Sequence, residues 1–366
     1  MKKVLIAGAG KIGSAIAALL SATPDFDVTV ADSSIASLAS LKTSPRIQRV
    51  TLDFTDQQAL RGALTGQFAV LSAAPFHLTT LMAEAAVAEG VHYLDLTEDV
   101  ASTRRVKELA ETARSALIPQ CGLAPGFVSI VAADLCRRFD SLHSVRMRVG
   151  ALPQFPSNAL NYNLTWSTDG VINEYCEPCE AIVEGVLRQV PPLAEHESFS
   201  LDGVTYEAFN TSGGLGTLCE TLQGKVTHLN YKTIRYPGHA AIMKVLLNDL
   251  RLRDRRHVLR DLLENALPAT LQDVVIVFVT VSGQRDGRLM QDTYAHKIYS
   301  GVTGGTLCSA IQITTAAGIC AVLDLLAGGH LPSRGFIRQE DIDLGDFLAN
   351  RFGSAYAKHP AERAAA

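Results

Sequence analysis

Residues 4–13 read VLIAGAGKIG, an apolar run followed by three glycines in a GxGxxG spacing, and an apolar helical pattern continues to Leu20. A strand, a glycine turn and a helix in this order predict a site for a dinucleotide. Gly8 permits the tight turn, Gly10 lets the backbone approach a pyrophosphate, and Gly13 lets the helix pack against the strand. The helix N-terminus adds amide donors and a positive dipole for the phosphates. The predicted cofactor-binding residues of this turn are Gly8, Gly10, Lys11, Ile12 and Gly13.

The first 125 residues continue with a regular alternation of short apolar runs and helical patterns. Strands with few charges, separated by helices, indicate a parallel sheet that is covered on both faces. Six such strands predict an α/β domain with a doubly wound, Rossmann-type sheet. The predicted strands are Val4–Ala7, Val28–Ala31, Arg49–Leu52, Ala69–Ser72, His92–Leu96 and Leu117–Cys121. The predicted helices are Ser14–Leu20, Gln57–Leu64, Leu78–Glu89 and Val100–Arg114.

After residue 125 the pattern changes to that of an α+β domain. Residues 145–149 alternate with period two, as an antiparallel strand with one solvent-facing side does. Two longer runs, joined by a turn, strengthen the prediction of a mixed or antiparallel sheet. The predicted elements are strands at 145–149, 227–234, 274–281 and 293–300, hairpin segments near 197–211, a turn at 284–287 and a helix from about Gly238.

The longest apolar stretch, residues 305–329, contains Gln312 and Asp324. It therefore predicts a buried core helix rather than a membrane span, and we expect this helix to return to the first domain. The predicted domains are a dinucleotide-binding domain at 1–125, completed by about 303–366, and a domain for substrate binding and oligomerisation at 126–302. Residues after Tyr356 are expected to form a frayed tail.

The composition is that of a globular protein, since 47% of the 366 residues are hydrophobic and 19% are charged. The formal net charge is −4 and no basic cluster stands out, so we expect neither nucleic acid nor a membrane as a partner. No cleavable signal precedes the first strand, and the seven cysteines are scattered, which predicts reduced thiols and a cytoplasmic location. Cys176 and Cys179 form a CxxC without a second pair, so no metal site is predicted.

An acidic residue, Asp32, closes the second predicted strand. A carboxylate at this point accepts hydrogen bonds from the hydroxyls of the adenosine ribose and repels a 2′-phosphate. No arginine stands beside it in Asp32-Ser33-Ser34. The predicted cofactor is therefore NAD rather than NADP.

Further cofactor contacts are predicted at the ends of the third and fourth strands. Asp53 closes the third strand, where the adenine would pass, although it could instead cap a helix that begins near Thr55. Small residues close the fourth strand, where the nicotinamide ribose would pass, and they let the backbone come close to the cofactor. The residues predicted there are Ser72, Ala73, Ala74 and Pro75.

Five segments spread along the chain carry a resemblance to a known family. They are GAGKIG at 8–13, YLDL at 93–96, GLAPG at 122–126, NTSGG at 210–214 and YKTIRYPGH at 231–239. Together they resemble the saccharopine dehydrogenase-like family, and most of all its L-lysine 6-dehydrogenase branch. The resemblance implies a Rossmann domain, a substrate domain inserted before returning helices, a small amino-acid substrate, and a homodimer or homotetramer.

The resemblance also implies an oxidoreductase acting on a CH–NH2 group. Saccharopine-forming relatives typically use NADP and carry a basic residue after the second strand, and Asp32 departs from that pattern. The expected reaction belongs to lysine degradation: NAD-dependent oxidative deamination of the ε-amino group of L-lysine. Its products are ammonia, NADH and 2-aminoadipate 6-semialdehyde, which cyclises to a piperideine carboxylate. Two alternatives stay open, a saccharopine or carboxylated-polyamine dehydrogenase of the same fold and a non-catalytic NAD-binding protein.

Oxidation of a primary amine needs the nitrogen lone pair, so the site must deprotonate an ammonium whose ordinary pKa is about 10.4. Lys232 and His239 are candidates for this step, because burial lowers the pKa of a lysine and histidine titrates near neutrality. Asp95, at the end of the fifth strand, is a third candidate, either as base or as partner of the substrate's ammonium. Each could instead be structural, Asp95 as a cap in the turn at 97–99.

Arg235 is the candidate for the substrate's carboxylate, because a guanidinium offers it two parallel donors, although it could instead form a surface salt bridge. Other candidates would form the wall of the site or offer it hydroxyl and amide groups. We expect Cys121 to be wall rather than nucleophile, since hydride transfer needs no covalent step. Trp166 could belong to the core, and Gly213 could simply permit a positive φ. These candidates are Cys121, Gly122, Tyr162, Trp166, Thr211, Ser212, Gly213 and Tyr236.

Overall fold

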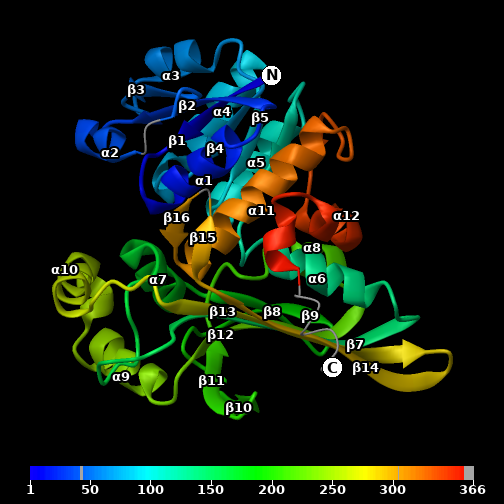
Figure 1. Cartoon of the computed structure of the whole chain (residues 1–366). Helices are drawn as coiled ribbons and strands as arrows, with labels where there is room; N and C mark the ends of the chain where they lie inside the picture. The colour runs from blue at the N-terminus through cyan, green and yellow to red at the C-terminus, as the bar shows by residue number, and fades with distance from the viewer. Residues whose placement is uncertain (42–43, 304, 358–366) are drawn as a thin grey trace. The chain divides into compact units, whose positions relative to one another are not determined.

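The computed structural model describes residues 1–41, 44–303 and 305–357 (Figure 1). The chain divides into two compact units, each described by itself below. Unit 1 comprises Met1–Ile130, Val302–Thr306 and Gln312–Ala366, and unit 2 comprises Val131–Gly301 and Leu307–Ile311. From position 358 onward, the tail predicted after Tyr356 lies outside the described residues.

A seven-stranded parallel sheet runs through unit 1, in the order β17-β6-β5-β4-β1-β2-β3. All six predicted strands are present, so the doubly wound α/β prediction is confirmed. The seventh strand, β17, comes from the far end of the sequence and pairs in parallel with β6. The strands are β1 (Lys2–Ala7), β2 (Phe26–Asp32), β3 (Ile47–Thr51), β4 (Ala69–Ser72), β5 (His92–Asp95), β6 (Ala116–Ile118) and β17 (Gly335–Phe336).

Helices connect these strands, and several begin at a side-chain cap. Asp56 caps α3 and Asp99 caps α5, each by accepting hydrogen bonds from backbone N–H groups of the first turn. The α4 helix ends at Gly90, whose φ of 69° suits glycine. The helices are α1 (Lys11–Ser21), α2 (Ile35–Ser40), α3 (Gln57–Leu64), α4 (Thr79–Glu89), α5 (Val100–Ala110), α11 (Ala310–Ala327) and α12 (Leu344–Ala349), with short turns η1 (Phe76–Leu78), η4 (Gln339–Asp341) and η5 (Gly353–Tyr356). The α6 helix (Phe127–Cys136) crosses from unit 1 into unit 2.

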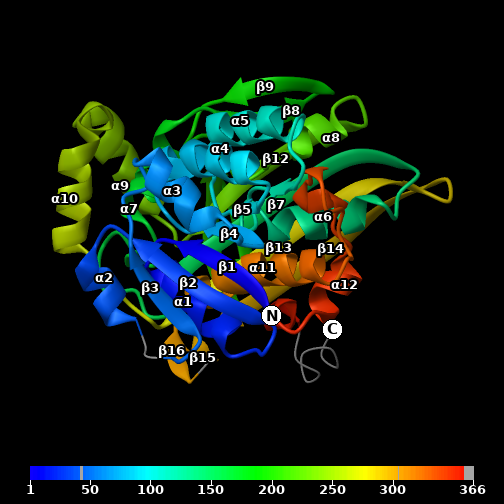
Figure 2. The same ribbon diagram turned by 90° about the horizontal axis from the view of Figure 1, so that it is seen from above.

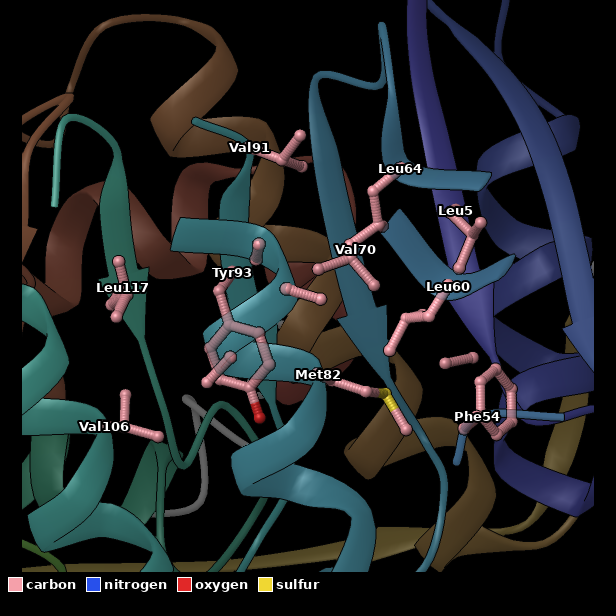
Figure 3. Packing of buried hydrophobic residues seen from close by; sticks show 14 of the residues in the cluster. Leu5, Phe54, Leu60, Leu64, Val70, Met82, Val91, Tyr93, Val106 and Leu117 are labelled. Carbon is pink, nitrogen blue, oxygen red and sulfur yellow. The ribbon is translucent and has the colours of Figure 1, made fainter. Parts of the chain in front are cut away.

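Apolar side chains of the strands and helices form a core on one face of the unit 1 sheet (Figure 3). Leu5 and Val70 come from neighbouring strands, Leu60 comes from α3, and Met82 comes from α4; all four are fully buried. This packing explains the near-continuous apolar runs of the strands, because a parallel sheet covered by helices has no solvent-facing side.

The α11 helix is long and apolar enough, by length and composition, to cross a membrane. However, 78% of its apolar window is buried inside the structure, as the sequence predicts for a core helix. It passes so close to the loop after β6 that a Cβ atom on Gly318 would lie 2.6 Å from the carbonyl oxygen of Cys121. The glycine is therefore required by close packing.

Unit 2 is built on a mixed eight-stranded sheet whose main path is β10-β11-β12-β7-β13-β14, with β8 beside β12 and β9 beside β8. Only the pairing of β12 with β7 is parallel. Asp286 and Gly287 turn the β13–β14 hairpin with φ angles of 53° and 71°, as a type I′ turn requires. The strands are β7 (Ser141–Pro153), β8 (Cys179–Val183), β9 (Val186–Val190), β10 (Glu197–Leu201), β11 (Val204–Asn210), β12 (Val226–Arg235), β13 (Asp273–Arg285) and β14 (Arg288–Tyr299). A separate small ribbon consists of β15 (Gly301–Thr303) and β16 (Thr306–Cys308).

Three helices of unit 2, α7, α9 and α10, lie together beside its sheet (Figures 1 and 2). Their apolar residues form one cluster with Phe209 of β11, and a second cluster, which includes Ile234 of β12, lies on the opposite face of the sheet. The helices are α7 (Thr168–Cys176), α8 (Leu218–Leu222), α9 (His239–Lys244) and α10 (Arg256–Ala266), with a π-helical turn η2 (Val245–Asp249) and a 3-10 turn η3 (Leu252–Arg255).

Candidate functional site

The glycine turn at the start of unit 1 has the geometry that a dinucleotide needs. Gly8 has a φ of 107°, and a Cβ atom there would lie 2.8 Å from the carbonyl oxygen of Ala73. A Cβ atom on Gly13 would lie 1.9 Å from the carbonyl oxygen of Gly8. Gly10 precedes α1 without any side-chain cap, and the space around its Cα is open. The uncapped amides of α1 therefore offer donors to a phosphate.

Asp32, at the end of β2, is tied to this turn. One carboxylate oxygen accepts a hydrogen bond from Ala9 N at 2.7 Å, and the other accepts one from Ser34 N at 2.7 Å. A carboxylate has about four acceptor positions, so both oxygens keep capacity for the hydroxyls of a ribose. The carboxylate is thus positioned beside the turn as the NAD prediction requires.

The residues after β4 and β3 differ in how they fit a cofactor. Ser72 is buried, and its hydroxyl has no hydrogen-bond partner within the described part of the chain. Asp53 is exposed and accepts hydrogen bonds from the N–H and the hydroxyl of Thr55, which hold the pKa of its carboxyl below the usual value. The alternative that Asp53 caps the next helix is wrong, because Asp56 caps α3.

Asp95, at the end of β5, is 1% exposed, and its carboxylate already accepts three hydrogen bonds. Its oxygens accept hydrogen bonds from the Tyr93 hydroxyl at 2.9 Å, Thr97 N at 3.0 Å and Gln120 N at 2.8 Å. Burial raises the pKa of Asp95 to about 6, against the opposing effect of these three bonds. Asp95 therefore fastens the loop after β5 to the loop after β6, which fits a positioning role better than that of an open base.

Cys121 and Gly122 follow β6. The Cys121 thiol is buried, donates to the carbonyl oxygen of Ile118 at 3.0 Å and accepts from the Gln339 side chain at 3.3 Å. Burial raises the pKa of this thiol well above its usual value, so it stays protonated. These contacts fit the predicted wall rather than a nucleophile.

In unit 2, Arg235 of β12 is joined to two further buried side chains. Its Nε donates to the Tyr175 hydroxyl at 2.9 Å, that hydroxyl lies 3.0 Å from Nε2 of His239, and Nδ1 of His239 lies 3.0 Å from the carbonyl oxygen of Leu160. A carbonyl only accepts, so Nδ1 carries the proton and Nε2 accepts from Tyr175. The donor and the acceptor of each hydrogen bond that links Arg235, Tyr175, His239 and Leu160 are thereby assigned.

This assignment bears on the predicted role of His239 in proton transfer. Burial, with the charge of Arg235, lowers the pKa of His239 to about 3, so the imidazole is neutral. Both ring nitrogens already have partners. His239 therefore positions Tyr175, and no free nitrogen remains for a substrate.

Arg235 and Lys232 lie on opposite faces of the sheet, because successive side chains of a strand alternate. Lys232 forms an ion pair with Glu197 at 3.1 Å, and the buried Arg148 also pairs with Glu197. Burial raises the pKa of Glu197, but the two cations outweigh it and the pKa is lowered. Lys232 thus belongs to a structural ion-pair cluster, whereas Arg235 has no acidic side chain within ion-pair distance among the described residues.

Tyr162 lies near Arg235, whose guanidinium carbon is 5.0 Å from the centroid of the Tyr162 ring. The hydroxyls of Tyr162 and Thr165 are buried, and neither has a hydrogen-bond partner within residues 1–41, 44–303 and 305–357. Trp166 is partly buried against the cluster under α7 and α10. The buried guanidinium, with the Tyr162 ring beside it, provides donors for an anion.

The other predicted substrate residues take part in hydrogen bonds or turns within the protein. The Thr211 hydroxyl pairs with that of Thr233 at 3.0 Å, and Ser212 N donates to Glu174 O at 3.0 Å. Gly213 has a φ of 83°, which glycine accommodates. Tyr236 donates to the carbonyl oxygen of Pro153 at 2.9 Å and packs in the cluster on the face opposite the helices, so it does not accompany Arg235.

Tyr175 was not singled out by sequence patterns, because its partners lie far away in the chain. Metal binding has no structural support within the described ranges, where no group of three or more His, Cys, Asp or Glu side chains is placed to hold an ion. Cys176 and Cys179 are both buried free thiols.

Two family models together match most of the chain. The saccharopine dehydrogenase NADP binding domain matches residues 4–118, and the saccharopine dehydrogenase C-terminal domain matches residues 122–352. The chain belongs to the saccharopine dehydrogenase family. The predicted family is thus confirmed, and unit 1 carries an NAD(P)-binding domain. The family match does not distinguish NAD from NADP.

Relatives in this family are distant in sequence. Saccharopine dehydrogenase [NADP(+), L-glutamate-forming] of Saccharomyces cerevisiae is 25% identical over 177 residues, 47% of this chain and 40% of the relative. Alpha-aminoadipic semialdehyde synthase, mitochondrial, of Bos taurus is 22% identical over 318 residues, 81% of this chain and 33% of the relative. The chain therefore spans less than half the length of these curated relatives.

Solved structures share the fold. The apo form of the L-Glu-forming saccharopine dehydrogenase from Saccharomyces cerevisiae aligns with a TM-score of 0.77 at 18% identity, over 95% of this chain and 97% of that one. Homospermidine synthase from Legionella pneumophila, in complex with NAD, aligns with a TM-score of 0.65 at 14% identity, over 98% of this chain and 90% of that one. At such identities the likeness establishes the fold alone.

Proposed function

We propose that the chain is an NAD-dependent dehydrogenase that oxidatively deaminates the ε-amino group of L-lysine. The products are 2-aminoadipate 6-semialdehyde, ammonium and NADH, and the semialdehyde cyclises to a piperideine carboxylate. The observation that carries the proposal is Arg235, a buried guanidinium that has no carboxylate within ion-pair distance among the described residues and interacts with the more distant charge of Glu174. A buried guanidinium without a paired carboxylate is costly, so a fold that keeps one has a use for an anion there.

The cofactor proposal rests on Asp32. The family model is named for NADP, but the carboxylate of Asp32 is fixed next to the glycine turn, where a 2′-phosphate would meet a negative charge. The ribose hydroxyls of NAD instead find acceptors there. Bound NAD accepts the hydride that the oxidation releases.

The substrate proposal rests on the number of buried cations that have no carboxylate within ion-pair distance. Arg148, Lys232 and Arg235 are the buried Lys and Arg side chains of the described chain. Arg148 and Lys232 both pair with Glu197, and Lys232 also pairs with Glu195 at 3.8 Å. One free guanidinium matches the single carboxylate of lysine, which it would bind with two parallel donors. Saccharopine carries three carboxylates and would need further cations.

The reaction sets two further requirements for the chain. The ε-ammonium must lose a proton before its lone pair can form a C=N bond. Water then adds to the resulting iminium carbon, and ammonium leaves as the aldehyde forms. One proton is released for each lysine, NAD⁺ and water consumed, so a basic group must carry that proton to solvent.

A second candidate is oxidation of saccharopine to glutamate and the same semialdehyde. It is favoured by the relatives, because the Saccharomyces cerevisiae enzyme that aligns over 97% of its own length bears that name. The oxidised bond is again CH–NH, so both reactions make similar demands on the cofactor site.

The experiment is to incubate the protein with NAD⁺ and L-lysine and to follow NADH and free ammonia together, with saccharopine and NADP⁺ as parallel arms. Equal amounts of NADH and ammonia from lysine support the proposal. NADH and glutamate from saccharopine alone would establish the second candidate, and no NADH from either would remove both.

The Arg235 assignment has its own test. Arg235→Lys keeps the charge but loses the two-donor geometry, so the KM for lysine should rise by about 10- to 100-fold. Arg146→Lys, at an exposed position on the neighbouring strand β7, is the control and should leave the KM unchanged. An unchanged KM in both variants would remove the carboxylate assignment.

A further inference from the structure

The loop after β5 contains a carboxylate that the site described above does not use. Glu98 lies in this loop between Asp95 and the start of α5. Within the described residues its carboxylate has no ion-pair partner and no hydrogen-bond donor other than its own backbone N–H. Its acidic neighbours are occupied, since Asp95 accepts three hydrogen bonds and Asp99 accepts one from Ser102 N at 2.7 Å. Glu98 is therefore the free carboxylate of the loop.

The backbone that carries Glu98 is fixed on both sides. Thr97 N donates to the carboxylate of Asp95 at 3.0 Å, and Asp99 N donates to the Thr97 hydroxyl at 3.1 Å. Asp99 in turn caps α5. A loop held by the side chains of Asp95, Thr97 and Asp99 keeps the backbone of Glu98 in a defined place, which is the arrangement that a reacting group needs.

The place of the loop follows from the strand order of unit 1. Dinucleotides bind across the carboxyl edge of such a sheet where the order reverses, here between β1 and β4. Asp32, after β2, takes the adenosine end, so the nicotinamide end belongs to the side of β4 and β5. Glu98 follows β5 directly and thus lies on the nicotinamide side of the sheet edge.

The electrostatic surroundings suit a base that works near neutral pH. Glu98 is partly buried, and burial is the largest cause that raises its pKa to about 7. The negative charges of Asp99 and Asp95 raise it further. The same three carboxylates attract a positively charged amine, and a base with a pKa close to the working pH is the most effective one.

We propose that Glu98 binds the ammonium group of the substrate and accepts one of its protons before hydride transfer. This role rests on the proposed function, because it needs an amine substrate. The proton moves from the substrate nitrogen to a Glu98 carboxylate oxygen. The freed lone pair forms the C=N bond as the hydride leaves the carbon, and the proton then passes from Glu98 to solvent.

The kinetic test compares Glu98→Gln and Glu98→Asp with Glu111→Gln, an exposed residue at the other end of α5. With NAD⁺ and L-lysine, Glu98→Gln should lower kcat/KM by about 100-fold, and Glu98→Asp should restore part of it. Wild-type kcat/KM should fall as the pH drops below about 7, and Glu98→Gln should lose that limb. Glu111→Gln should match the wild type, and all four proteins should bind NADH equally.

A second readout does not depend on turnover. Lysine is titrated into the cofactor-free protein by calorimetry, at pH 7, in two buffers of different ionisation enthalpy. Binding of an ammonium beside a half-protonated carboxylate releases protons, so the wild type and Glu111→Gln should show release and Glu98→Gln should show none.

The outcomes separate the two claims. No lysine-dependent NADH from the wild type would refute the proposed function, and with it this role of Glu98. NADH from the wild type, together with an unchanged pH profile and unchanged proton release in Glu98→Gln, would refute the role of Glu98 and leave the proposed function standing.

Discussion

The Tyr175→Phe variant tests the hydrogen-bonded chain that holds Arg235. The ring remains and keeps its edge contacts with Phe209 and His239, so the packed volume barely changes. Two buried groups lose their partner, the charged Nε–H of Arg235 and Nε2 of His239. A hydrogen bond to a charged group contributes about 1.5–3 kcal/mol and a neutral one about 0.5–1.5 kcal/mol. We therefore expect unit 2 to lose about 3 kcal/mol of its free energy of unfolding.

The assay uses the one tryptophan of the chain, Trp166, which lies in unit 2 and packs against its apolar cluster. Its fluorescence during urea titration reports the unfolding of that unit. With an m value of about 2 kcal/mol per molar urea, the midpoint should fall by about 1.5 M. Tyr299→Phe is the control, because Tyr299 is 50% exposed and forms no hydrogen bond through its hydroxyl in the described structure.

Tyr299→Phe should change the free energy of unfolding by no more than about 0.5 kcal/mol. The reasoning fails if Tyr175→Phe shifts the urea midpoint no further than this control does. In that case the hydroxyl of Tyr175 does not hold Arg235, and the assigned hydrogen bonds from Arg235 to Tyr175 and from Tyr175 to His239 would have to be abandoned.

Three further predictions follow from the charges of the described residues. Burial lowers the pKa of His239 from 6.5 to about 3, so between these pH values the unfolded chain binds a proton at His239 and the folded chain does not. The urea midpoint should therefore fall as the pH drops from about 6.5 towards 3, and it should fall less in His239→Asn. Asp32→Ala should weaken NADH binding by about 10-fold in a fluorescence titration and strengthen NADPH binding, since it removes both the charge-assisted hydrogen bonds to the ribose and the repulsion of a 2′-phosphate. Glu197→Gln leaves Arg148 without a carboxylate and Lys232 with only that of Glu195, 3.8 Å away; the free energy of unfolding in urea should fall by about 3 kcal/mol, while the KM for lysine stays unchanged.

Most of unit 1 was predictable because its local signals agree with one another. The glycine turn, the apolar strands and the helices between them all favour one parallel sheet, and the structure has that sheet. The exception is β17, which has only two residues and therefore no periodicity to detect. It pairs because β6 would otherwise leave an open edge, a condition that only the assembled sheet creates.

The candidate site was less predictable. The segment at 231–239 is dense in polar groups, yet Lys232 and Arg235 point to opposite faces of one strand, and the strand predicted at 227–234 stops just short of Arg235. His239 meets Tyr175 and Leu160, which are 64 and 79 positions away in the chain. No local pattern encodes contacts at such separations. Such separations also hide from the sequence why Arg148 pairs with Glu197 whereas Arg235 has no carboxylate within ion-pair distance among the described residues.

The position of β17 near the end of the sequence also determines when the sheet of unit 1 is completed during synthesis. When β6 leaves the ribosome, the backbone N–H and C=O groups along its outer side have no partner, and they stay bare until Gly335–Phe336 is made. All of unit 2 is translated in that interval. During that interval the unpaired edge of β6 can pair with a strand of another nascent chain, which leads to aggregation. Unit 1, whose residues are made first, is therefore the last to be completed, and its β6 edge stays unpaired for most of the synthesis of the chain.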